Sequence, residues 1–200
     1  MIRTAASALA LSLALAGPVL ATPQSRDPAK VPAGAYVLDK HHASLVARVP
    51  HLGGFSRYTL RLTGLDGSFT YDPANWQATK VTFTVDPRSA DTGDAGFNKD
   101  IAGFLGADKY PAITFTSTAV TAGADGQGTV TGDLNFHGVT KPVTLDATFN
   151  GVGPGLLGAG TRLGFSGKTR IKRSDFGATA VSQWAGDDVD LEFEIEFTKK

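Results

Sequence analysis

The sequence predicts an all-β protein of about eight antiparallel strands with one short helix, closed as a barrel or packed as a sandwich. Short segments in which apolar and polar residues alternate recur through the chain, which is typical of strands with one buried face. The 24 glycines fit frequent turns between such strands. A single segment of helical spacing interrupts the series. An eight-stranded barrel is just wide enough to hold one small ligand.

The last strand shows the alternation most clearly. Its apolar side chains share one face, and they are Val189, Leu191, Phe193, Ile195 and Phe197. Its acidic side chains share the other face, and they are Asp190, Glu192, Glu194 and Glu196. Because successive side chains of a strand point to opposite faces, a slip of one residue would bury the carboxylates. The register of this strand is therefore strongly specified.

Residues 132–145 predict a hairpin. Leu134 and Phe136 alternate with polar residues before the turn, and Val143 and Leu145 do so after it. Gly138 supplies an unusual backbone angle for the turn. Pro142 cannot donate to a ladder, so we expect it where the second strand begins.

The same pattern predicts strands over residues 36–38, 44–49, 58–62, 67–71, 80–85, 113–116, 129–136, 143–150 and 161–171. Residues 94–106 differ, because Phe97, Ile101, Phe104 and Leu105 follow helical spacing. Gly96 and Gly103 weaken this segment, so we expect only a short helix.

The chain begins with a candidate signal peptide over residues 1–21. Arg3 precedes an uncharged apolar run, and Val19 and Ala21 suit cleavage by signal peptidase. We therefore expect a periplasmic protein, with a flexible linker over residues 22–34 and one barrel domain over residues 35–200. No membrane-spanning segment is expected after cleavage; an uncleaved anchor helix is the alternative.

Composition excludes several classes of protein. The chain has no cysteine, so no disulfide or lipid-anchored cysteine is expected and the core alone must stabilise the fold. Lys and Arg number 19 and Asp and Glu number 19, so bulk charge suggests neither nucleic-acid binding nor attraction to an anionic surface.

No cofactor or metal site is expected. Four histidines lack HxH or HxxxH spacing, and His41 and His42 would point to opposite faces of a regular strand. Residues 153–158 read GxGxxG, but a strand follows them and no βαβ unit surrounds them. Leu156 and Leu157 in this loop could cap a channel mouth, or the loop could be a plain hairpin connection.

No catalytic residue is identified either. The serines lack a nucleophile-elbow context. Residues 173–177 contain Arg173, Asp175 and Phe176, yet a structural turn explains them better. Asp175 would accept local backbone hydrogen bonds, Phe176 would fill the core and Gly177 would adopt positive φ.

Six blocks of the sequence, in order, resemble the YceI family of periplasmic polyisoprenoid-binding proteins. The blocks are Asp39–His42, His51–Gly53, Asp66–Asp72, Lys109–Ser117, Gly132–Leu134 with Gly138–Val143, and Arg173–Gly177 with Gly186–Val189. Departures at Ala47 and Asn98–Ile101 are expected to change the pocket mouth.

The resemblance implies a lipocalin-like antiparallel eight-stranded barrel that binds a long-chain isoprenoid or related lipid in an apolar channel, without a cofactor. The ligand-binding residues it implies are Phe83, Val85, Phe97, Ile101, Phe104, Leu105, Tyr110, Phe115, Phe136 and Phe165, with His42 meeting a polar head group or pinning the barrel mouth. The alternatives are a protein-interaction module with a filled barrel, and a small hydrolase or isomerase acting in the pocket. A homodimer is left open.

Overall fold

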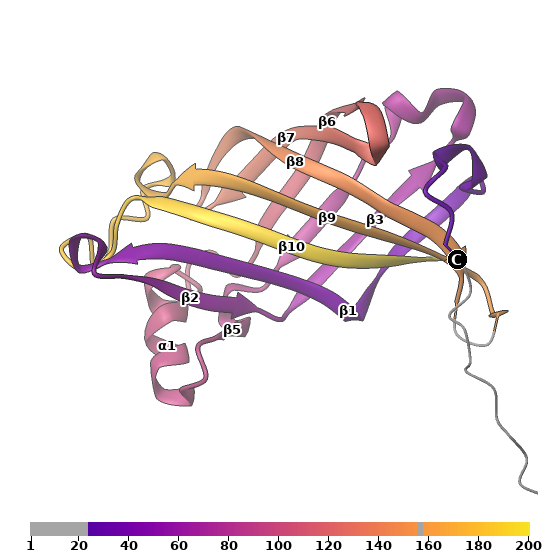
Figure 1. The fold of residues 1–200 in the computed structure, drawn as a ribbon. Helices are drawn as coiled ribbons and strands as arrows, with labels where there is room; N and C mark the ends of the chain where they lie inside the picture. The colour runs from indigo at the N-terminus through magenta and orange to yellow at the C-terminus, as the bar shows by residue number, and fades with distance from the viewer. Residues whose placement is uncertain (1–23, 156–157) are drawn as a thin grey trace, which may run out of the picture.

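The computed structural model describes residues 24–155 and 158–200, which hold ten strands and one α-helix (Figure 1). The strands are β1 (Gly34–His51), β2 (Ser56–Leu62), β3 (Leu65–Tyr71), β4 (Thr82–Val85), β5 (Ala90–Asp91), β6 (Ile113–Ala122), β7 (Gln127–Phe136), β8 (Val139–Pro154), β9 (Thr161–Lys172) and β10 (Asp188–Lys199). The helix is α1 (Ala95–Phe104). Short 3-10 turns are η1 (Pro28–Lys30), η2 (Leu52–Gly54), η3 (Pro73–Ala78), η4 (Pro87–Ser89), η5 (Ala124–Gly126) and η7 (Arg173–Phe176).

Eight of the strands close into an antiparallel barrel, in the order β1-β3-β4-β6-β7-β8-β9-β10, and β10 pairs back onto β1. The barrel predicted from the sequence is confirmed, and the sandwich is excluded, because one continuous ladder joins all these strands. One edge of β1 pairs with β10, and its other edge pairs with two strands in turn. Residues 34–37 pair with β3, whereas residues 45–51 pair with β2, which continues to β5.

β1 is one long strand, where the sequence suggested two short ones at 36–38 and 44–49. Its ladder to β10 runs from Tyr36 to Leu38 and resumes at Ala43. Phe197 faces Leu38 and Ile195 faces Ala43, so four residues of β1 stand opposite one residue of β10. This bulge carries the polar residues 39–42 outside the barrel wall without ending the strand.

The predicted faces of the last strand are confirmed. In β10, Phe197 is only 2% exposed and Ile195 packs against the main core cluster, while Glu192 and Glu194 are exposed. The pairing of Phe193 with Leu45 and Ile195 with Ala43 sets this register across the closure of the barrel.

The hairpin and the helix are also confirmed. His137 and Gly138 both have positive φ, at 53° and 79°, as a two-residue type I′ turn between β7 and β8 requires. Asp94 caps α1 by accepting hydrogen bonds from the N–H groups of Gly96 and Phe97. Pro142, however, lies inside β8 rather than at its start. β9 pairs with β8 only from Asp146 onward, so no ladder to β9 is present at Pro142.

Part of the expected linker lies against the barrel. Ser25 forms an isolated bridge with Val152 of β8, and Val31 is buried in the main core cluster. The hydroxyl of Tyr36 donates to the carbonyl oxygen of Pro32 at 2.7 Å. The expected signal peptide and the residues Leu156 and Leu157 lie outside the described residues. Among the described residues, no helix has both the length and the apolar content needed to cross a membrane.

Candidate functional site

The inward face of the barrel wall is the candidate site, because its side chains are apolar and many keep accessible surface. Strand alternation places Leu163, Phe165 and Ile171 of β9 on this face, together with the apolar residues of β10. The half-buried apolar residues packed against the main core cluster include Leu45, Tyr58, Leu60, Phe83, Phe149, Phe165 and Ile195. An inward side chain that stays half-buried has apolar surface that a ligand could still cover.

One end of the barrel is filled by side chains. There the rings of Tyr36 and Phe69 stack at 5.1 Å, and Phe197 meets Phe69 edge to face at 4.9 Å. Phe165 approaches both Phe69 and Phe197, at 6.4 and 6.1 Å. Val31, next to η1, closes this end, where β1 begins. The aromatic cluster Tyr36–Phe69–Phe197 therefore forms the floor of the interior.

Farther along the wall, phenylalanine rings lie over inward glycines. A Cβ on Gly67 would stand 2.7 Å from Cδ2 of Phe83, and one on Gly132 would stand 2.5 Å from Cζ of Phe115. The ring of Phe193 occupies the corresponding space over Gly167 on the neighbouring strand. A ring that folds onto a glycine lies against the wall instead of pointing across the barrel.

The strand residues predicted as ligand contacts fall in two groups. Phe83, Phe115 and Phe165 are half-buried on inward positions of β4, β6 and β9. Val85 and Phe136 are buried, and Phe136 packs with Phe176 in a second core cluster. The first group offers surface to a ligand, whereas the second mainly stabilises the wall.

The residues predicted from the helix region lie in different environments. Ile101 of α1 is buried, and Phe104 and Leu105 are half-buried against the main core cluster. The ring of Phe97 is partly exposed and meets Tyr58 edge to face at 5.7 Å. Tyr110 instead packs on His137 of the β7–β8 turn, with ring centroids 4.8 Å apart.

Sequence reasoning missed two sets of inward residues. Tyr58 and Leu60 of β2 were not named, although their alternation with Arg57 and Arg61 carries the usual signal of a one-sided strand. The glycines under the phenylalanine rings were also missed. Their pairing depends on which strands are neighbours, so no local signal identifies them.

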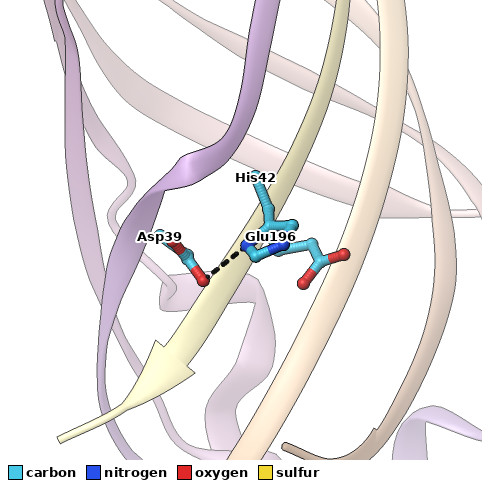
Figure 2. A group of neighbouring side chains, drawn as sticks. All are labelled: Asp39, His42 and Glu196. Atoms are coloured by element: carbon cyan, nitrogen blue, oxygen red, sulfur yellow. Dashed lines mark hydrogen bonds and ion pairs between the residues drawn. The ribbon is translucent and has the colours of Figure 1, made fainter. Parts of the chain in front are cut away.

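His42, which was expected to meet a polar head group or to pin the barrel mouth, lies outside the barrel wall. The bulge of β1 turns the His42 side chain outward, where Nδ1 lies 2.9 Å from Oδ2 of Asp39 (Figure 2). Arg162 of β9 donates to Asp39 at 2.5 Å and to Glu196 of β10 at 2.6 Å. This network clamps β1, β10 and β9 together where the bulge interrupts their ladder.

The Asp39 carboxyl has a pKa of about 2, below its usual 3.8. Partial burial by itself raises this pKa, but hydrogen bonds from His42, Arg162 and the His41 N–H together outweigh that effect. Hydrogen bonds to Glu196 and Asp39 raise the pKa of Arg162 in turn. The Asp39 carboxylate and the Arg162 guanidinium therefore stay charged over the physiological range.

Asp39, His42 and Glu196 also have the ligand types and proximity that a metal ion needs. The positive charge that these groups hold in the structure is the Arg162 guanidinium, which contacts both carboxylates. A divalent ion here would have to displace that guanidinium or suffer its repulsion. The residues therefore fit a structural ion-pair network better than a metal centre.

The turn at residues 173–177 has the structural role that we predicted, with one change. Phe176 is buried and Gly177 has a φ of 70°. The carboxylate that accepts from the Ser174 backbone N–H is Asp187, at 2.9 Å, whereas Asp175 pairs with Lys141 at 3.4 Å. A more distant carboxylate thus takes the hydrogen-bonding role that we expected of Asp175.

Two hollows lie on the outside of the wall. The larger, about 910 Å³, is bordered by outward residues such as Ser44, Lys168 and Glu194 and by the η5 loop. The smaller, about 390 Å³, lies where β8 and β9 have no ladder, between Pro142 and Arg170. Polar and apolar groups both line the hollows, and Val143, Ile171 and Phe176 border the smaller one beside its charged groups.

Comparison with known proteins gives a consistent assignment. The family model described as a YceI-like domain matches residues 36–197, which span the whole barrel. A UPF0312 protein of Vibrio cholerae is 42% identical over 172 residues, covering 84% of this chain and 89% of the relative.

Solved structures share the fold. BcnA of Burkholderia cenocepacia superposes with a TM-score of 0.69 at 24% identity, covering 80% of this chain and 98% of BcnA. A polyisoprenoid binding domain from Saccharophagus degradans, implicated in plant cell wall breakdown, gives a TM-score of 0.62 at 18% identity. It covers 82% of this chain and 98% of that domain. At these identities the likeness concerns the architecture of the barrel.

Proposed function

This chain belongs to the YceI family, and from that premise we propose that it binds a long-chain isoprenoid or similar amphiphilic lipid inside the barrel. The observation that carries the proposal is the half-buried inward surface, on which Phe83, Phe115 and Phe193 lie over glycines of neighbouring strands. The polyisoprenoid-binding domain with the same architecture supports the choice of ligand class.

The chemistry of the inward face favours an apolar chain. Burying one CH₂ group contributes about 0.8 kcal/mol, so one five-carbon isoprene unit contributes roughly 4 kcal/mol before costs. Ordering the flexible chain and the loss of its translational freedom offset much of this gain. Affinity is therefore expected to rise with chain length and to change little with salt, since no ion pair is involved.

The proposal includes transport or storage rather than catalysis. A hydrolase or isomerase would need an acid–base pair at the ligand. The inward residues named above include no histidine or carboxylate, and the described cluster of His42 with Asp39 and Glu196 lies outside the wall. Export to the periplasm completes the proposal, and mature protein whose N-terminus is at or near Thr22 would support it. Native mass spectrometry would also decide whether the chain forms a homodimer.

The direct test is titration calorimetry with a short and a long prenol, together with lipid extraction from protein purified from its own periplasm. We expect one ligand per chain and tighter binding of the longer prenol. Phe115→Asp should abolish binding, because it places a charge on the inward face of β6. The matched control is Thr114→Asp on the outward face of the same strand. Thermal melts check that both variants fold. The proposal is wrong if neither prenol binds and the purified protein carries no lipid.

A further inference from the structure

Three large apolar side chains stand exposed together where the β1–β2 connection meets the loop before β10. Phe55 is 90% exposed, Trp184 is 53% exposed and Leu52 is 45% exposed. They are three of only five large hydrophobic residues exposed in the part of the chain that the structure describes. We call the two segments that carry them, residues 50–56 and 179–186, the apolar tip.

The two segments form one unit. His51 and Ala185 make a β-bridge, and the Leu52 N–H donates to the Trp184 carbonyl oxygen at 2.8 Å. The Gly186 N–H donates to the carbonyl oxygen of Pro50 at 2.7 Å. In Figure 1 both segments lie at the end of the barrel opposite the C-terminus. The exposed side chains therefore sit on a joined structure and not on two independent loops.

Several backbone groups of the tip have hydrogen-bond partners within the protein. The Arg173 guanidinium donates to the carbonyl oxygens of Ala178, Ala180, Ala185 and Gly186, at 2.6 to 2.8 Å. The N–H groups of Trp184 and Ala185 both donate to the Val181 carbonyl oxygen. A segment whose backbone groups are paired internally can leave water with little loss of hydrogen bonding.

The tip has almost no ionisable side chains of its own, and parts of its backbone are conformationally constrained. Residues 179–186 include no ionisable side chain, and residues 50–56 include only His51. Leu52 and Val181 are held at positive φ, 46° and 53°, where residues other than glycine are rare. Such conformations persist when the surrounding contacts enforce them, and they cluster at functional sites.

From these observations we propose that the apolar tip docks this protein on a phospholipid bilayer, with Phe55, Trp184 and Leu52 entering the interfacial region. Trp and Phe suit that region, because they combine a large apolar surface with tolerance of the headgroup boundary. Of the arginines near the tip, Arg173 donates to backbone carbonyl oxygens, and Arg57 and Arg170 share the carboxylate of Asp190. Docking thus depends on apolar insertion and requires no anionic lipid.

The inference rests on the proposed function for its purpose, since a lipid carrier must meet the membrane that supplies or accepts its ligand. The tip extends from β1 and β2, whose inward residues Tyr58 and Leu60 are half-buried. The Tyr36–Phe69–Phe197 floor lies at the other end. Docking therefore brings the inward residues of β2 close to the bilayer.

The chain offers a built-in pair of reporters, because it has only two tryptophans. Trp184 is on the tip. Trp76 is in η3, which follows the end of β3 that pairs with the beginning of β1, and so lies at the opposite end of the barrel. Trp76→Phe leaves emission only from Trp184, and Trp184→Phe leaves emission only from Trp76.

The experiment mixes each variant with vesicles of brominated phosphatidylcholine, with and without added phosphatidylglycerol. We expect the Trp184 emission to shift to the blue and be quenched, and the Trp76 emission to stay unchanged. Phe55→Ser should lower vesicle partitioning at least about tenfold, because partitioning follows the apolar area inserted. Its melting temperature should not change, since this side chain is exposed.

Each outcome decides the inference. Quenching of Trp184 alone, lost in Phe55→Ser, supports docking by the tip. No vesicle binding, equal quenching of both tryptophans, or dependence on phosphatidylglycerol overturns it. Self-association that Phe55→Ser abolishes, without vesicle binding, would assign the tip to a second copy of the chain and overturn it too. Prenol titrations without vesicles separate the two proposals. If the unmodified protein does not bind prenol, the carrier function is wrong, but a positive vesicle result still supports docking by the tip.

Discussion

At the end of the barrel where β1 begins, Tyr36, Phe69 and Phe197 pack together away from solvent, whereas at the end where β1 turns into β2, Phe55 and Trp184 stand exposed. Both ends are rich in aromatic residues, but Phe55 and Trp184 stay exposed although Phe136 and Phe176 form a second core cluster at their end. The same side-chain chemistry thus stabilises the fold at one end and is left available for contact at the other.

The phenylalanines on the wall between the two ends are intermediate in exposure. Its phenylalanines point inward but lie over glycines, so they keep accessible surface. The aromatic side chains therefore differ along the barrel: they are buried in the floor, half-buried on the wall and exposed at the tip. The polar clamp of Arg162 with Asp39 and Glu196 fastens the filled end from outside, beside the bulge in β1. A second core cluster, Phe136 with Phe176 and Ala178, packs at the other end.

The largest expected difference between the two ends is in the effect of a phenylalanine on stability. Phe197→Ala should lower the free energy of unfolding by about 3–5 kcal/mol, because it leaves a cavity in a packed cluster. Phe55→Ala should stay within about 0.5 kcal/mol, since its ring contacts mostly water. Urea unfolding of both variants measures the difference. Similar losses in the two would show that the ends are not organised as described.

The middle of the barrel can be tested through a glycine. Gly67→Ala should push the Phe83 ring off the wall, lower stability by about 1–3 kcal/mol and weaken prenol binding about tenfold. Gly164→Ala is the matched control, because a Cβ there would meet only Asn150 at an ordinary 3.5 Å. Calorimetry and urea unfolding give the two readouts. Unchanged prenol affinity in Gly67→Ala would remove Phe83 from the binding surface.

The clamp predicts a loss of stability in acid. The pKa of Asp39 is about 2 in the folded protein and near 3.8 when unfolded, so its stabilisation is present above about pH 4 and is lost as pH falls toward 2. Asp39→Asn should cost about 1–2 kcal/mol at pH 6 and show a smaller further loss between pH 4 and 2.

Unfolding curves at pH 6, 4 and 2.5 for the unmodified protein and Asp39→Asn check this prediction. Asp188→Asn serves as the control, because its pair with Lys172 is solvent-exposed and should contribute little to stability. Parallel acid dependence in the unmodified protein and Asp39→Asn would contradict the assigned role of Asp39.

The smallest expected effect concerns metal ions. Because Arg162 already contacts both carboxylates of the Asp39–His42–Glu196 cluster, neither Zn²⁺ nor a chelator should shift the melting temperature. Differential scanning fluorimetry with each additive measures this. A clear rise with Zn²⁺ that disappears in His42→Ala would instead identify a metal site at the clamp.

The sequence by itself determined the features that depend on neighbours in the chain. Alternation in β10 predicted its buried and exposed faces, and the helical spacing of Phe97, Ile101 and Phe104 predicted α1. His137-Gly138 lies between two alternating segments, so the hairpin could be predicted from the turn chemistry alone. These features follow from periodicity and local backbone preference, which a short stretch of sequence contains in full.

Only the tertiary structure decided which distant residues meet. Asp39 and Arg162 are 123 residues apart, so the β1 bulge and its clamp could not be predicted from local pattern. The seating of Phe83 on Gly67, and the joining of Leu52 to Trp184, likewise depend on strand neighbours and loop contacts. Whether an inward phenylalanine fills the barrel or lines it depends on the residue opposite, which is set by closure of the sheet.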